Sequence, residues 1–215
     1  MKRLLTAIAL ATLAASAGAQ VTFSGGTDQL ITGVYNPSGT LLTTPPVPNG
    51  GKRDATLSTT AGVLTVTFLG YEALDTDTFF KMSVGTLTNK TATPDVSSLS
   101  GIVSAGTLDF NFSDMTLGTG VGNGGGGGGS GLFDSYVVLG TLSPTGGAFV
   151  PYTKGGLYDL VIGFNDSLAV DGDYDDFVVG LRVTAVPEPE SYALMLAGLV
   201  AVGFIARRRR GRPQA

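Results

Sequence analysis

Apolar and polar residues alternate along several stretches in the middle of the chain. Residues 64–68 alternate leucine, valine and phenylalanine with threonine, and a period of two recurs in residues 108–112 and 177–184. Such alternation places an apolar row on the buried face of a strand and a more polar row outward. No window of similar length repeats apolar residues at helical spacing. The pattern predicts a single all-β domain over residues 20–186, a β-sandwich that is jelly-roll-like.

Two segments lack this alternation and are expected to be loops. Residues 43–51 are rich in proline and glycine, and residues 124–129 are six consecutive glycines. The glycine run lacks the Lys and Ser/Thr of a phosphate-binding P-loop. Because glycine has high backbone entropy, residues 40–53 and 120–131 are predicted to be the least ordered parts of the domain.

The N-terminal residues have the pattern of a secretion signal. Two basic residues at positions 2 and 3 precede an apolar run over residues 4–15, and small residues follow at Ala17 and Ala19. A charged start, a short apolar helix and an A-x-A site are what translocation and signal peptidase require. We therefore expect residues 1–19 to be a helical signal peptide, cleaved so that the mature chain begins at Gln20.

The C-terminal residues have three parts of different character. Pro187, Glu188 and Pro189 precede an apolar stretch of 15 residues from Tyr192 to Ala206. A cluster of four basic residues follows: Arg207, Arg208, Arg209 and Arg210. A comfortable membrane span needs about 20 apolar residues, but flanking arginines can extend to the interface and the bilayer can thin. The stretch therefore predicts a short transmembrane helix whose arginines stay in the cytoplasm.

This three-part arrangement resembles the PEP-CTERM sorting signal of Gram-negative bacteria. In that family a Pro-Glu-Pro motif, a short transmembrane helix and a basic tail are recognised by an exosortase, a membrane-embedded enzyme similar to cysteine transpeptidases. The resemblance implies that residues 187–215 are the sorting signal of an exosortase substrate. The protein would lie in the inner membrane before processing, then in the outer envelope, at the cell surface or outside the cell. An ordinary C-terminal anchor is the alternative.

The composition of the chain excludes several kinds of catalytic and metal-binding group. The chain has no Cys, His or Trp, which removes the thiol nucleophile, the commonest general base and the commonest zinc ligands. Between Gln20 and Val186 there are 6 basic and 15 acidic residues, a net charge of −9. Such a domain repels nucleic acid and attracts divalent cations. We expect it not to be an enzyme.

Five aspartates near the end of the domain are the candidate metal ligands: Asp166, Asp171, Asp173, Asp175 and Asp176. Three of them alternate along a short segment that contains a glycine, and alternating aspartates can place several oxygens around Ca²⁺. The segment is not an EF-hand, because its sixth position is Asp176 and its twelfth is Arg182. A solvated acidic turn between two strands is the alternative. Glu72, with Asp75 and Asp77, forms a second acidic group, which we interpret as a turn.

A second resemblance concerns the domain itself. Residues 68–73, and residues 163–166 with 171–176, look like segments of a recurring group of PEP-CTERM exported proteins associated with extracellular polysaccharide and biofilm. The sequence therefore predicts a non-enzymatic surface or matrix protein with exopolysaccharide as its partner. A secreted calcium-dependent carbohydrate-binding module is the main alternative. A hydrolase that uses two carboxylates is a further one.

Overall fold

The computed structural model describes residues 20–31, 48–73, 75–81, 84–125, 134–143, 147–166, 173–186 and 189–210. The chain divides into two compact units, Met1–Thr184 and Ala185–Ala215. Every regular element described in the first unit is a strand, which confirms the all-β prediction. The sandwich and its jelly-roll-like form stay predictions. The predicted signal helix lies outside the described residues.

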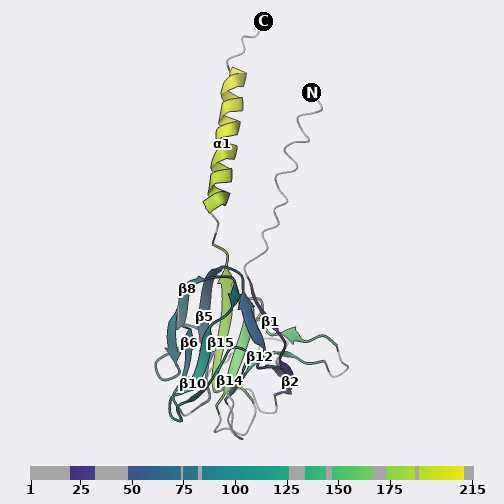
Figure 1. The fold of residues 1–215 in the computed structure, drawn as a ribbon, viewed down its shortest axis with the longest axis vertical. Coiled ribbons are helices and arrows are strands. Elements are labelled where there is room, and N and C mark those ends of the chain that lie inside the picture. Colours follow the sequence, from purple (N-terminus) through teal and green to yellow (C-terminus); the bar gives the residue numbers. More distant parts are fainter. Residues whose placement is uncertain are drawn as a thin grey trace. The chain divides into compact units, whose positions relative to one another are not determined.

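The largest sheet of the first unit is built from antiparallel neighbours (Figure 1). Its order is β2 (Thr27–Leu30), β3 (Gly50–Arg53), β12 (Ser135–Thr141), β14 (Leu160–Asn165), β15 (Phe177–Thr184), β5 (Gly62–Gly70) and β8 (Ser98–Val103), with β13 (Val150–Pro151) beside β12. Neighbouring strands are often distant in sequence. For example, β15 pairs with β5 from Val178 to Thr184.

Two smaller sheets complete the unit. The four-stranded sheet has the order β11 (Thr119–Gly122), β10 (Phe110–Asp114), β6 (Asp77–Lys81) and β7 (Gly85–Thr88). The three-stranded sheet has the order β1 (Val21–Ser24), β4 (Thr56–Thr59) and β9 (Gly106–Thr107). All strand pairs of the first unit lie within Val21–Thr184. Because this part also contains its own apolar core, we expect it to fold by itself.

The four-stranded and the largest sheet share one aromatic core. Phe112 of β10 stacks on Phe164 of β14, with ring centroids 5.1 Å apart and an interplanar angle of 6°. Phe110 meets Tyr136 of β12 edge to face, with centroids 5.3 Å apart. Because these rings come from facing strands of different sheets, their burial is what holds the two sheets together.

The alternation predicted for residues 64–68 is confirmed, because Leu64, Val66 and Phe68 are buried and the intervening threonines are less so. The prediction for residues 177–184 is wrong in its first half, where all of Phe177–Leu181 is buried. The reason is a second apolar cluster on the other face of the largest sheet. It consists of Leu69, Val137, Leu139, Tyr152, Val161, Tyr174 and Val178.

The loop predictions are wrong at two places. Gly50 and Gly51 belong to β3, which lies between β2 and β12, and residues 119–122 form β11. A Cβ on Gly51 would lie 2.8 Å from the Val137 Cβ, so glycine here allows close strand contact and does not indicate a loop. Residues 32–47 and 126–133 lie outside the described residues.

The second unit contains helix α1 (Pro189–Arg210), shown in yellow in Figure 1. The helix predicted for residues 192–206 is thus present. Among the described residues, however, no helix is long and apolar enough to cross a membrane, in contrast to the predicted transmembrane helix. The apolar run of 15 residues is shorter than the roughly 20 that a comfortable span requires.

Candidate functional site

The residues predicted from the N-terminal signal peptide and the C-terminal sorting signal lie partly outside the described part of the structure. Ala17, Ala19, Pro187 and Glu188 are among those not described. Gln20, the predicted first residue of the mature chain, is exposed, and its backbone N–H donates to the Thr60 hydroxyl over 3.1 Å. Pro189 and the four arginines Arg207, Arg208, Arg209 and Arg210 lie within α1.

Four of the five predicted metal ligands are described, and all four are buried. Asp166 directly follows β14, and Asp173, Asp175 and Asp176 directly precede β15. Asp171 lies outside the described residues. The burial contradicts the alternative of a solvated acidic turn for the four described aspartates.

The segment before β15 is held against the neighbouring strand by a close backbone approach. Tyr174 has a left-handed φ of 62°, and its carbonyl oxygen would lie 2.2 Å from a Cβ placed on Gly163 of β14. Because only glycine leaves this space, Gly163 lets the segment lie directly on the sheet. The Tyr174 ring packs into the second apolar cluster, and the flanking aspartates are thereby carried into the interior.

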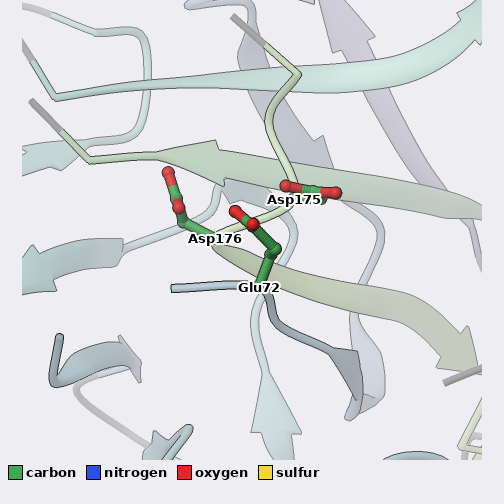
Figure 2. Close-up of side chains that lie close together, drawn as sticks. All are labelled: Glu72, Asp175 and Asp176. Carbon is green, nitrogen blue, oxygen red and sulfur yellow. The ribbon is translucent and has the colours of Figure 1, made fainter. Parts of the chain in front are cut away.

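Asp175 and Asp176 form the first carboxylate group together with Glu72 (Figure 2). One carboxylate oxygen of each lies within 4.8 Å of the others. Figure 2 shows the Glu72 side chain extending from the segment after β5 toward the two aspartates. The Glu72 backbone N–H donates to the Asp175 carbonyl over 2.9 Å, which keeps the two segments adjacent. Glu72 is exposed, so this group extends from the interior to the surface.

Asp176 has an electrostatic environment that disfavours its charge. Burial raises its pKa to about 9, and the nearby Asp166 charge adds to the shift. The Asp166 backbone N–H, which donates to the Asp176 carboxylate over 2.8 Å, opposes the shift but does not cancel it. A group placed in this way is stabilised either by a proton or by a bound cation.

Asp166 forms the second carboxylate group together with Asp75 and Asp114. One oxygen of each again lies within 4.8 Å of the others. Asp114 is the last residue of β10, and Asp75 lies in the connection between β5 and β6. Asp77, the first residue of β6, is next to this group and is fully buried. Burial raises the pKa of Asp77 to about 8, and the charges of Asp166, Asp114, Asp75 and Asp134 add to the shift.

The two acidic groups of the sequence therefore lie together in the structure. The prediction that Glu72, Asp75 and Asp77 form only a turn is wrong, because Asp77 begins a strand and its side chain faces inward. Sequence reasoning missed Asp114 and Asp134 as members. Asp114 has a signal, since it continues the alternating row of Phe110 and Phe112 on the buried face.

Oxygen-only groups of this kind suit a hard divalent cation. Ca²⁺ takes six to eight oxygens at about 2.3–2.6 Å, so its ligand oxygens lie at most about 5 Å apart. Both carboxylate groups satisfy this limit. Each supplies three carboxylates, and backbone carbonyls and water would complete the coordination.

Comparison with known families identifies the C-terminal segment. The PEP-CTERM protein-sorting motif matches residues 185–210. No curated protein and no solved structure matches the chain.

Proposed function

We propose that this chain, a PEP-CTERM sorting-domain protein, is a non-enzymatic protein of the cell surface or extracellular matrix that acts with exopolysaccharide in a biofilm. The sorting motif at residues 185–210 carries the proposal. It indicates an exported protein that an exosortase sorts, with a C-terminal signal anchored at the membrane before processing. The β-domain is the part that processing would deliver.

The position of the motif supports separate roles for the C-terminal sorting signal and the β-domain. It begins at Ala185, where the second compact unit begins and just after β15 ends at Thr184. Cleavage within the motif would thus leave every strand and both apolar clusters of the described domain intact. Composition supports a non-enzymatic role, because the chain has neither a histidine base nor a cysteine nucleophile.

Mass spectrometry of the exported protein tests the sorting step. In cells that contain the exosortase, we expect a product that starts at Gln20 and lacks Arg207–Arg210. Substitution Glu188→Gln changes the motif, whereas Glu190→Gln is a matched control just outside the Pro-Glu-Pro sequence. The first should block processing and the second should not. An intact C-terminus in the final location would overturn the proposal.

A calcium-dependent carbohydrate-binding module is the second candidate. The observation that favours it is the first carboxylate group, in which exposed Glu72 joins buried Asp175 and Asp176. A cation held there would lie near the surface, where hydroxyl groups of a sugar could complete its coordination. Glycan-array binding that disappears on addition of a chelator, and also in Glu72→Gln, would support this candidate. Binding that is unchanged by the chelator would exclude it.

A further inference from the structure

Four aspartates stand at one end of the two facing sheets as two cross-strand pairs. In the four-stranded sheet Asp77 and Asp114 are direct partners in the β6–β10 register. In the largest sheet Ser135 of β12 pairs with Asn165 of β14. Asp134 directly precedes β12 and Asp166 directly follows β14, so the two aspartates lie beside this pair. All four are buried. A cation among them would therefore contact both sheets at once.

Asp77 and Asp114 have carboxylate oxygens that no protein group in the described structure satisfies. Both oxygens of Asp77 are buried without a hydrogen-bond partner, and its side chain is 0% exposed. Asp114 is also 0% exposed. Its Oδ1 accepts from the backbone N–H groups of Thr116 at 2.7 Å and Leu117 at 3.1 Å, whereas Oδ2 has no partner. Buried polar atoms are normally satisfied, so these three oxygens require a proton, a water molecule or a bound cation.

No basic side chain of the described residues hydrogen-bonds these three oxygens. Three ion pairs of the domain lie elsewhere and join Lys52 to Asp28, Arg53 to Asp54 and Lys154 to Asp95. The basic residue of β6, Lys81, is buried on the same face as Asp77 but pairs with Phe110 at the far end of the strand. Four residues along a strand correspond to about 13 Å, which is too far for an ion pair with Asp77.

Hydrogen bonds of the surrounding residues hold the backbone in place around these oxygens. Asn89, which is 2% exposed, accepts from the Asp77 backbone N–H over 3.1 Å through its side-chain oxygen. Its side-chain nitrogen donates to the Asp75 carbonyl over 2.9 Å. Met115 N–H donates to the Thr76 carbonyl over 2.8 Å and so joins the β5–β6 connection to the end of β10. These contacts fix the chain on both sides of the unsatisfied oxygens.

We propose that Asp75, Asp114 and Asp166, together with the unsatisfied Asp77 carboxylate beside them, bind one Ca²⁺ ion that joins the two sheets at this end of the domain. Asp134 adds negative charge beside it. Four carboxylates match Ca²⁺, whereas Mg²⁺ usually retains several waters and takes only one or two carboxylates. Soft and borderline metals prefer thiolate or imidazole ligands, and this chain has neither cysteine nor histidine.

This site differs from the aspartate-loop site predicted from the sequence, with which it shares only Asp166. It also does not depend on exosortase sorting or on carbohydrate binding. Its role is structural: the chain has no cysteine, so no disulfide can join the sheets. A cation that binds only the folded domain would stabilise it by mass action. Calcium modules of extracellular proteins bind with a Kd of about 10⁻⁴ to 10⁻³ M.

The test uses residues 20–186, with calcium titrated into chelator-treated protein by calorimetry and thermal unfolding. We expect binding in the millimolar range or tighter and a rise in Tm of at least about 3 °C. Asp77→Asn and Asp114→Asn keep the side-chain shape and remove one charge each. Both should lose the calcium-dependent rise, and Asp77→Asn in chelator should unfold at or above the wild-type temperature. Asp109→Asn, at an exposed aspartate just before β10, is the matched control.

Glu72→Gln separates this site from the first carboxylate group. It should keep the calcium-dependent rise in Tm while Asp77→Asn and Asp114→Asn lose it. The proposal is overturned if calcium neither binds nor stabilises the wild-type domain. It is equally overturned if Glu72→Gln loses the response and Asp77→Asn or Asp114→Asn retains it. If one aspartate variant does not fold, the other decides between these outcomes.

Discussion

Asp77 and Asp114 are direct cross-strand partners on β6 and β10, and both side chains are fully buried. Like charges directly opposite each other destabilise a sheet, and the interior strengthens their repulsion. The same register places Phe79 opposite Phe112 two residues further along, where the aromatic contact is favourable. The β6–β10 pair thus contains a stabilising aromatic contact and an acidic pair whose electrostatic repulsion must be offset. Local conflict of this kind is typical of a binding site.

The first prediction concerns pH in the absence of metal. The pKa of Asp77 is raised to about 8 and that of Asp176 to about 9, against about 3.9 in an unfolded chain. Between about pH 4 and pH 8 the folded state therefore holds protons that the unfolded state has lost. Stability in chelator should fall as pH rises through this window, by up to about 1.4 kcal/mol per pH unit for each such carboxyl.

Denaturant unfolding at several pH values in chelator measures this slope. Asp77→Asn should make the slope shallower, since the raised carboxyl is gone. Asp109→Asn should leave it unchanged, because that side chain is exposed. A stability that rises steadily from pH 5 to pH 8 in the metal-free protein would contradict the prediction.

The second prediction concerns Asn89 as a positioning residue. Asn89→Ala removes the side-chain hydrogen bonds to the backbones of Asp77 and Asp75 and leaves a buried N–H without a partner. We expect a loss of about 1–3 kcal/mol in the free energy of unfolding. The stabilisation by calcium should also weaken. Loss of a purely structural contact elsewhere in the domain would not weaken it. Exposed Thr91, two residues after Asn89, provides the control, and Thr91→Ala should change stability by less than about 0.5 kcal/mol.

Much of the fold follows from the sequence, because alternation reports burial on one face of a strand. Leu64, Val66 and Phe68 show this for β5. Where both faces are covered, as in β14 and the first half of β15, the alternation disappears and cannot indicate which side faces the core. The glycines of β3 look like loop residues, since the contact with β12 that they permit is not visible in their own sequence.

Only some residues of the candidate site can be predicted from the sequence, for a related reason. The aspartates before β15 lie close together in sequence, so their spacing alone suggests shared ligands. Asp77 and Asp114 belong to strands that are separated by several other elements, and only their pairing brings them together. The useful signal was local: each continues an apolar row, Asp77 before Phe79 and Asp114 after Phe112. An acidic residue at the end of such a row faces inward.

The third prediction concerns the close approach at Gly163. In Gly163→Ala the new Cβ would lie 2.2 Å from the Tyr174 carbonyl oxygen, and backbone atoms cannot move away cheaply. The segment that carries Asp173, Asp175 and Asp176 should shift from β14, at a cost of about 1–3 kcal/mol. Gly122→Ala is the matched control, because its nearest contact would be an ordinary 3.6 Å. Thermal unfolding compares the two, and equal stability of both variants would show that the approach at Gly163 is not constrained.

The fourth prediction concerns the buried hydroxyl of Tyr136. This hydroxyl accepts from the Gly124 backbone N–H over 2.9 Å and donates to the buried carbonyl of Ala55, so it joins β12 to the segments beside β4 and β11. Tyr136→Phe keeps the ring contacts with Phe110 and leaves both backbone groups without this partner. We expect the free energy of unfolding to fall by about 1–3 kcal/mol, measured by denaturant unfolding.

Burial raises the pKa of Tyr136 to about 12. Spectrophotometric titration of the folded wild type should therefore show one tyrosine that ionises about two pH units above the usual value, and this tyrosine should be missing from the variant. A variant as stable as the wild type would mean that water replaces the hydroxyl at this position.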